Sequence, residues 1–468
     1  MDIWECIYTR RSERRFKGES GRAIPGKDIE EILDSARYAF QIENIPQWRF
    51  LFIRDQNTKQ VLADFAQEVA HMIFGQSYEI FSGHLWYLPE ERRPTIAEYT
   101  QTGELWKYPL EADFVVIPCI TKGAWFDSRV PYMEQATAVG GMAIQNMWLT
   151  AHKLGWGAGC NAMPLNDIRR RELFSTFSGV PMSWQMCAAY CFGDRTSARS
   201  VGPSRASLEG VAFNEHWGNR FIRIGFRDDS SEIAIPTKDV TEVIKGVRNC
   251  YKFDANAEVE DWKLEKMIHC GIWSPNPENL NHWRHIVIRD EKIKEFVAQC
   301  TKEAFLLEYK ASFEQTKAHH PHLSDDELLQ YVEWMLDEGW KYPLECNVMI
   351  LTTFAKDWVE YPHIAGTLPG GIDYIWSTAT GCAIQNMRLA AHALGLETQV
   401  NLYPIAEFRR NEQFVTHLGI PSSWVPLTLL CVGEAGDAPD FVFKKRPVPS
   451  IKDLVFDEHW GIRHTPLK

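Results

Sequence analysis

Four arginines and a serine fall within six positions near the start of the sequence, at Arg10, Arg11, Ser12, Arg14 and Arg15. A guanidinium group binds a phosphate through paired hydrogen bonds, and a hydroxyl group adds another donor. The segment therefore predicts a clamp for a phosphate-bearing ligand. Basic runs are also common on protein surfaces, so a solvated basic patch is the alternative interpretation.

Three further segments carry polar or turn-forming residues next to predicted helices. They are the loop 39–48 with its later counterpart 274–283, the loop 160–164, and the segment 202–209. Each segment is a weak signal alone, and the information lies in their order along the chain.

The sequence is duplicated. Residues 44–55 return as residues 279–290, so the two copies are offset by 235 positions in a chain of 468. Three shorter segments repeat in the same order: 106–111 as 340–345, 143–147 as 383–387, and 213–218 as 456–461. This period is far longer than the roughly 20 to 50 residues of a solenoid repeat, and each copy is large enough to bury its own core. We predict two domains, 1–235 and 236–468, packed like the subunits of a two-fold dimer.

Composition narrows the class of protein. With 45% hydrophobic and 24% charged residues, the chain is typical of soluble globular proteins, and its net charge of −12 argues against a nucleic-acid surface. No signal peptide is apparent, and no uncharged apolar run approaches the roughly 20 residues of a membrane helix. The eleven cysteines are scattered without a CxxC pair, which predicts neither disulfides nor a metal site. We expect a cytoplasmic protein that acts on a small molecule and binds no membrane.

The predicted elements mix helices and strands without regular βαβ alternation, which favours an α+β fold. In the first copy we expect helices at 3–9, 28–38, 136–154 and 167–174, and strands at 49–54, 111–120 and 186–192. In the second copy we expect helices at 261–272, 377–394 and 405–415, and strands at 284–289, 346–353 and 426–432. The inserts 58–105 and 292–339 are candidates for a lid over a site, with Trp86, Tyr87 and Tyr99 as possible pocket residues.

In this order, the motifs resemble those of the nitroreductase family of FMN enzymes. The family pattern Arg-Arg-Ser-x-Arg-x-Phe is matched from Arg10 to Phe16, its loop and strand by residues 39–55, and its buried helix by residues 143–157. The resemblance covers essentially the whole chain, twice. It implies two α/β sandwich domains that form an intramolecular pseudo-dimer, with FMN bound at the interface between them.

The resemblance also implies roles for individual residues. Arg10, Arg14 and Arg205 would neutralise the FMN phosphate, while Arg11 and Ser12 would contact the ribityl chain, the pyrimidine edge or the phosphate. The second copy would supply the loop over the flavin, with Pro275, Asn276 and Asn279. In the loop formed by Ala162, Met163 and Pro164, the backbone N–H of Met163 would approach flavin N5 and stabilise the reduced flavin. Relatives often have Gly at position 164 and Lys at position 206, where this chain has Pro and Ala, and Arg195 or Arg199 could compensate.

The two copies have diverged unequally. Val247, Asn249 and Tyr251 stand where the first copy has Arg10, Ser12 and Arg14, so the second clamp has lost two charges and a hydroxyl. In the loop the difference is reversed, because the first copy has Phe40-Gln41 where the second keeps Pro275-Asn276. An intact clamp would therefore face an intact loop at one site only. We expect one FMN per chain and one vestigial or repurposed site.

These residues predict an oxidoreductase that passes hydride from NADH or NADPH, through FMN, to a nitroaromatic, a quinone or an activated alkene. No catalytic side chain is required, because the protein binds and tunes the flavin. A protein that sequesters FMN without turnover, a flavin-dependent dehydrogenase of a specific metabolite, and a pseudoenzyme without flavin are the alternatives. Turnover with NAD(P)H separates the enzymes from the sequestering protein, and a colourless purified chain would indicate the pseudoenzyme.

Overall fold

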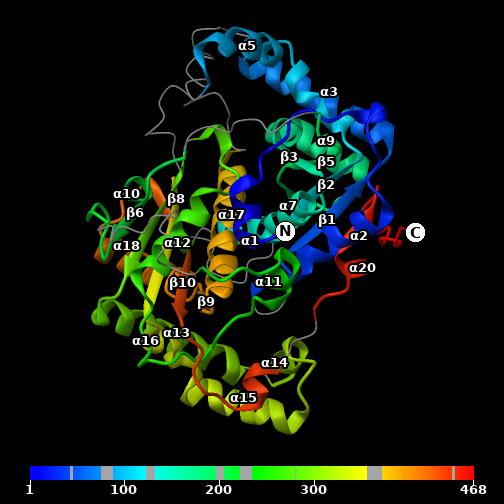
Figure 1. Ribbon diagram of the computed structural model, residues 1–468. Helices are drawn as coiled ribbons and strands as arrows, with labels where there is room; N and C mark the ends of the chain where they lie inside the picture. Colours follow the sequence, from blue (N-terminus) through cyan, green and yellow to red (C-terminus); the bar gives the residue numbers. More distant parts are fainter. Residues whose placement is uncertain are drawn as a thin grey trace.

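The computed structural model describes ten segments of the chain: residues 1–42, 46–74, 88–122, 132–196, 205–221, 235–279, 281–311, 313–355, 372–444 and 448–467. It contains two mixed β-sheets, one for each copy of the sequence, with the long helices α7 (Tyr132–Lys153) and α17 (Ile372–Ala393) between them (Figure 1). The predicted α+β class is therefore confirmed. No helix in the described segments is both long enough and apolar enough to cross a membrane.

The first copy contributes six strands and nine named α-helices within the described residues. The strands are β1 (Trp48–Ile53), β2 (Phe114–Thr121), β3 (Gly157–Asn161), β4 (Trp184–Met186), β5 (Ala189–Gly193) and β6 (Ala212–Asn214). The helices, besides α7, are α1 (Ile3–Thr9), α2 (Gly26–Ser35), α3 (Gln56–Phe74), α5 (Arg93–Gln101), α6 (Tyr108–Glu111), α8 (Met163–Asn166), α9 (Ile168–Ser178) and α10 (Leu208–Val211).

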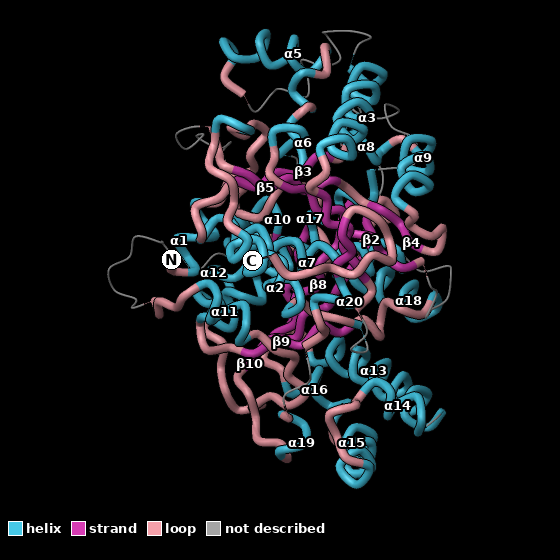
Figure 2. The backbone as a smooth tube through the Cα atoms, turned by 90° about the vertical axis from the view of Figure 1, so that its right-hand side faces the viewer, coloured by secondary structure: helices cyan, strands magenta, loops and turns pink. Residues whose placement is uncertain are grey.

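The second copy repeats this plan. Its strands are β7 (Trp283–Ile288), β8 (Val348–Ala355), β9 (Glu397–Asn401), β10 (Trp424–Gly433) and β11 (Val455–Asp457). Its helices, besides α17, are α11 (Val240–Gly246), α12 (Asp261–Ile272), α13 (Glu291–Ala311), α14 (Phe313–His319), α15 (Asp325–Asp337), α16 (Tyr342–Glu345), α18 (Phe408–Leu418), α19 (Asp440–Phe443) and α20 (Ile451–Leu454). The helical inserts of the two copies, α3 with α5 and α13 to α15, lie at opposite ends of the molecule (Figures 1 and 2).

One predicted strand is wrong in its extent. The strand expected at 186–192 is divided into β4 and β5, and both parts pair with β2. Its counterpart in the second copy is the single strand β10, which keeps its pairing with β8 through a register shift between Pro426 and Thr428. A local irregularity of this kind leaves the apolar pattern unchanged, so the pattern alone does not reveal it.

Each copy sends its last strand into the sheet of the other. β6 pairs in parallel with β7, and β11 pairs in parallel with β1. The sheet orders are therefore β11-β1-β2-β5-β3 and β6-β7-β8-β10-β9. The two copies share both sheets, so neither sheet is complete without residues from the other half of the chain.

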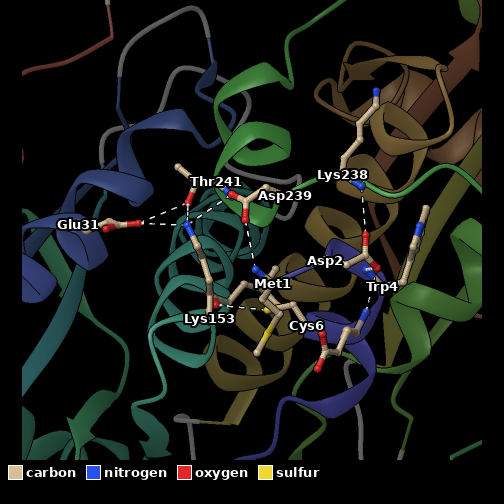
Figure 3. A network of polar contacts seen from close by, with 11 residues as sticks. Met1, Asp2, Trp4, Cys6, Glu31, Lys153, Lys238, Asp239 and Thr241 are labelled. Carbon is tan, nitrogen blue, oxygen red and sulfur yellow. Dashed lines mark hydrogen bonds and ion pairs between the residues drawn. The ribbon is translucent and has the colours of Figure 1, made fainter.

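The two halves are also joined where each begins. The Asp2 carboxylate accepts hydrogen bonds from the backbone of Trp4, at 3.0 Å, and of Lys238, at 3.1 Å (Figure 3). Asp239 caps α11 through the backbone N–H of Thr241 at 2.9 Å, and its carboxylate lies 3.4 Å from the Lys153 ammonium at the end of α7. The N-terminal caps of α1 and α11 therefore lie side by side where the second copy begins, and the cap of α11 contacts the end of α7.

Helices α7 and α17 make the closest contact between the copies. A Cβ atom at Gly141 would lie 2.0 Å from the carbonyl oxygen of Thr378, and one at Gly381 would lie 1.8 Å from that of Ala138. Only glycine permits this approach. Beside the glycines, Gln145 Nε2 donates to Asn386 Oδ1 at 2.7 Å, inside the buried interface.

We predict that Gly141→Ala destabilises the chain by about 3 kcal/mol, because the new methyl group has only backbone to displace. Gly210→Ala is the matched control, because the nearest atom to its Cβ would be Ser207 Oγ at 3.5 Å, and its effect should stay within about 1 kcal/mol. Urea unfolding of both variants provides the measurement. Equal stability of the two variants would show that the helices can separate at no cost.

The C-terminal arm, which we define as the residues after β10, contacts the first copy through His464. Its buried imidazole lies 2.6 Å from Asp457 Oδ1 and 2.9 Å from Oε1 of Glu30 on α2. Burial alone would lower the pKa of His464, but the hydrogen bonds to the two carboxylates outweigh it and raise the pKa above its ordinary 6.5.

Because the folded pKa of His464 is raised, the protonated imidazole stabilises the fold below about pH 6.5, and this contribution is lost as the pH rises through the folded pKa. We expect His464→Gln to lower the free energy of unfolding by about 2 kcal/mol at pH 6 and by less at pH 9. Denaturant unfolding at both pH values tests this, with His71→Gln on the exposed side of α3 as control. A pH-independent difference would contradict the assigned protonation.

Candidate functional site

A cavity of about 140 Å³ lies between the two copies and contains six of the eleven site residues predicted from the sequence. The first copy contributes Ser12, Arg14, Ala162 and Met163, and the second contributes Pro275 and Asn276. The remaining lining is mostly aromatic and apolar: Trp106, Trp148, Cys160, Asn166, Tyr190, Pro277, Ile375, Trp376, Ala379 and Cys382. The predicted pairing of the first clamp with the second loop is thus present in the fold.

Arg10 lies behind this cavity in an unusual position for a cation. Its side chain is 1% exposed and its guanidinium group lies 5.0 Å from the ring of Trp148, which lines the cavity. Nη2 donates to the carbonyl oxygen of Trp273 at 3.2 Å, but Nε and Nη1 have no hydrogen-bond partner in the described structure. Burial, together with the positive charge of Arg205, lowers the pKa of Arg10 to about 9.

Two more arginines gather at the same place. The guanidinium groups of Arg11 and Arg205 lie 5.2 and 5.4 Å from the ring of Trp273. Burial and the charge of Arg11 lower the pKa of Arg205 to about 10. Within the described ranges, none of the three arginines makes an ion pair with a carboxylate. Three guanidinium groups without a carboxylate partner, two of which (Arg10 and Arg205) have a buried N–H group unpaired, fit a bound phosphate.

The segment that carries Ser12 and Arg14 is held against the edge of β3. The backbone N–H of Glu13 donates to the carbonyl oxygen of Ala158 at 2.9 Å. A Cβ atom at Gly159 would lie 1.7 Å from the carbonyl oxygen of Glu13, so glycine is required for this approach. The close contact places Ser12 and Arg14 on the cavity wall.

In the loop after β3, the backbone N–H of Met163 already has a hydrogen-bond partner. Met163 begins the short helix α8, and its backbone N–H donates to Asn161 Oδ1 at 3.2 Å. The second copy has the same bond from Tyr403 to Asn401 at 3.0 Å. Pro164 is buried in α8 and does not line the cavity. The role of the Met163 N–H toward flavin N5 remains a prediction, and a ligand there would share this donor with Asn161.

The loop of the second copy reaches the cavity with its first residues only. Pro275 and Asn276 line it, and Asn276 is held by Asn281, whose Oδ1 accepts from Asn276 Nδ2 at 2.8 Å. Asn279 is 5% exposed with a φ of 58°, and its backbone N–H donates to the carbonyl oxygen of Asn276 at 3.1 Å. In this structure Asn279 shapes the loop and does not line the cavity.

Several lining residues were missed by sequence reasoning because they look like core. Trp148 on α7 and Trp376 on α17 lie in largely apolar helices, where an aromatic residue indicates packing. Trp376 stacks on His282, with ring centroids 4.8 Å apart. One signal was available, because Trp148 is replaced by Arg388 in the second copy. A change of this size between duplicated positions in a buried helix indicates a site.

Other candidate residues play no part in this cavity. Trp86, Tyr87 and Arg199 lie outside the described residues. Tyr99 is 45% exposed on α5 and is not part of the lining, so the structure does not place it in the pocket. Arg195 is placed by a backbone bridge to Phe16 and does not line the cavity.

The cavity offers little acid, base or nucleophile chemistry of its own. Its described lining contains no Asp, Glu, His or Lys. Burial raises the pKa of the Cys160 thiol to about 12 and also raises that of Cys382, so neither is a thiolate at neutral pH. A reaction in this cavity therefore needs a bound group that carries the chemistry.

Comparison with known proteins identifies the class. The model of the nitroreductase family matches residues 7–194 and 244–434, which together make up most of the chain. The chain therefore belongs to the nitroreductase family, as a tandem duplication of two nitroreductase-like domains. The segments that follow the two matched ranges, 195–243 and 435–468, include the two exchanged strands β6 and β11.

Solved structures similar to this chain include a nitroreductase with bound FMN from Desulfitobacterium hafniense DCB-2, at 21% identity over 45% of this chain and 93% of that chain, with a TM-score of 0.30. Oxidized iodotyrosine deiodinase bound to FMN and 3-iodo-L-tyrosine is 17% identical over 48% of this chain and 100% of that chain, with a TM-score of 0.32. A putative nitroreductase in complex with FMN from Desulfovibrio desulfuricans is 20% identical over 43% of this chain and 91% of that chain, with a TM-score of 0.30. No curated protein matches the chain.

We predict that Arg10→Met raises the free energy of unfolding of the ligand-free chain by about 1 to 3 kcal/mol, because it replaces a buried cation without a counter-ion by an apolar side chain of similar length. Arg15→Met is the matched control, since Arg15 is largely exposed and paired with Glu111, and its effect should stay below about 0.5 kcal/mol. Urea unfolding of flavin-stripped protein measures both. A lower free energy of unfolding in Arg10→Met would contradict this prediction and show that Arg10 stabilises the ligand-free fold.

Proposed function

We propose that the chain is an FMN-dependent oxidoreductase with one FMN site, formed by the clamp of the first copy and the loop of the second. The observation that supports this most directly is Arg10, a buried cation with Nε and Nη1 unpaired, beside Arg11 and Arg205. An FMN phosphate would supply the missing negative charge and acceptors. Family membership and the mixed origin of the cavity support the same assignment.

The residues would divide the work as follows. Arg10, Arg11 and Arg205 would bind the phosphate, and Ser12 and Arg14 would hold polar groups of the cofactor at the cavity wall. The aromatic and apolar lining, with Trp148 and Trp376, would hold the planar ring system and exclude water. When bound, FMN supplies hydride transfer, here between NADH or NADPH and a small organic acceptor such as a nitroaromatic, a quinone or an activated alkene.

The counterpart cleft supports a single FMN site. The cavity that corresponds to the first one by its lining has a volume of only about 50 Å³, against about 140 Å³, and a second cavity of about 370 Å³ adjoins it. Phe40, Gln41, Asn249 and Tyr251 line it where the first site has Pro275, Asn276, Ser12 and Arg14. Larger side chains and a lost clamp argue against a second flavin there.

The flavin content of the purified chain is the first test. We expect about one FMN per chain, which is lost in Arg10→Ala and retained in Arg248→Ala, because Arg10 has unpaired buried guanidinium N–H groups beside the first cavity, whereas Arg248 is paired with Glu397 at the counterpart cleft. Absorbance spectra and quantitation of FMN released on denaturation measure this. Two FMN per chain would contradict the single site, and no FMN after reconstitution would contradict the oxidoreductase.

Turnover of the flavin-loaded chain then separates the catalytic proposal from the alternatives. NADH or NADPH should reduce the bound flavin, and a quinone or nitroaromatic should reoxidise it, in alternate half-reactions followed by stopped-flow absorbance. Retention of FMN without reduction by either nucleotide would instead indicate a protein that sequesters FMN. Reduction of the flavin only by a particular metabolite would indicate a dehydrogenase.

A further inference from the structure

We propose that the second cleft has become a binding site for a phosphate-bearing small molecule other than FMN, with Arg388 at its centre. The proposal goes beyond the flavin site, which lies at the other end of α7 and α17 and uses different residues. It rests on a cavity, on a buried cation with an unpaired N–H, and on an exchange of residues between the two copies.

The cavity lies on the outer side of Phe40. It has a volume of about 370 Å³ and is lined by residues of the first loop, of α11 and the segment after it, of α17 and of the C-terminal arm. Phe40, Gln41, Asn249 and Tyr251 line both this cavity and the small inner one, so they separate the two.

Five cations line this outer cavity: Arg37, Lys245, Arg248, Arg388 and Lys444. Its described lining contains no Asp or Glu. Three of the cations have acidic partners elsewhere, Arg37 with Asp34, Arg248 with Glu397, and Lys444 with Glu327. Lys245 and Arg388 make no ion pair among the described residues. In a chain of net charge −12, this cavity concentrates positive charge that would attract an anion.

Arg388 is the strongest element of the site. It is 2% exposed, its Nη2 donates to Asn249 Oδ1 at 3.0 Å, and its Nε donates to Thr398 Oγ1 at 3.4 Å. Nη1 is buried and has no partner in the described structure. Its guanidinium group also lies 5.7 Å from the ring of Phe40. Two of the three guanidinium nitrogens are therefore hydrogen-bonded within the protein, while Nη1 is left for a ligand at the cavity.

The two copies carry a buried arginine at different positions of the duplicated sequence. Arg10 stacks on Trp148 in the first copy, whereas the second copy has Val247 and Arg388 at these two positions. The first copy thus carries this arginine in the segment after its first helix, and the second copy carries one in its long buried helix. A buried arginine is costly unless something compensates its charge. Glu397, which pairs with Arg248 and lies near His392, compensates it in part.

The cations of the cavity indicate which charged group the ligand carries. Five cations from four segments of the chain, two of them without an ion pair in the described structure, offer more charge and more donors than a single carboxylate needs, and they match the several acceptor oxygens of a phosphate group. Apolar and aromatic residues beside them, among them Tyr38, Val247 and Val442, could hold an organic body. The site thus fits a small phosphate ester.

The test uses the FMN-loaded chain and isothermal titration calorimetry with two probes, inorganic phosphate and AMP. We expect one molecule to bind per chain in competition between the probes. Arg388→Met should weaken binding about tenfold or more, because it removes a charge-assisted hydrogen bond. Lys245→Gln, at an exposed position, should weaken it about threefold, and Arg463→Gln, an exposed cation elsewhere, should leave it unchanged.

Each outcome decides the question. Equal affinity of the wild-type chain and of both Arg388→Met and Lys245→Gln would overturn the site, and so would the absence of binding by both probes. Two FMN per chain would also overturn it, because the cleft would then be a second flavin site. A chain that holds no FMN but binds AMP through Arg388 would uphold this site while contradicting the proposed oxidoreductase, so the two proposals fail separately.

Discussion

The contact between α7 and α17 is the constraint on which the rest of the structure depends. The glycines bring the helix backbones together. Two buried hydrogen bonds between side-chain amides then cross the interface, from Gln145 to Asn386 and from Gln385 to Asn146. Asn146 Nδ2 also donates to the carbonyl oxygen of Ser35 at 3.1 Å, and Asn386 Nδ2 to that of Cys270 at 2.9 Å. Ser35 ends α2 and Cys270 lies near the end of α12. One network therefore fixes both helices from which the two site loops begin.

The same contact places each site between the copies. α7 contributes Trp148 to the first cavity, and α17 contributes Trp376, Ala379 and Cys382. Such a cavity cannot exist in either copy alone, because its walls come from both helices. The exchanged strands β6 and β11 strengthen this dependence, since they complete each sheet with residues of the other copy. Packing, sheet pairing and site geometry are thus consequences of one interface.

Much of this could be predicted from the sequence, and the failures have physical reasons. The helices 3–9 and 261–272 were predicted with their observed bounds because their apolar patterns are clear, and Asp2 also caps the first of them. The exchange of β6 and β11 was not predicted, because each strand has three residues and its partner is far away in sequence. The amide network was also hidden, because Gln145 and Asn146 in an apolar helix do not reveal which helix they face.

The sequence led to part of the cavity wall, and it missed wall residues whose presence packing also explains. A basic segment is also explained by a solvated surface, so the order of the motifs singled this one out, and its Ser12 and Arg14 line the cavity. Tryptophan in a buried helix has an ordinary explanation, so Trp148 was not recognised. Pro164 and Asn279 were inferred from the family pattern, and the structure uses them to shape a helix and a loop beside the site.

Fusion of the two copies explains how their sites could diverge. In a two-fold homodimer, a substitution appears at both interfaces, so Val247 in place of an arginine would remove both phosphate clamps. In the fused chain the two interfaces are different sequences, so one can change while the other does not. An arginine at position 148 would place a further cation beside Arg10, whereas Arg388 has valine, Val247, at the position that corresponds to Arg10. The asymmetry in charge between the two clefts is therefore a property that only the duplicated chain can hold.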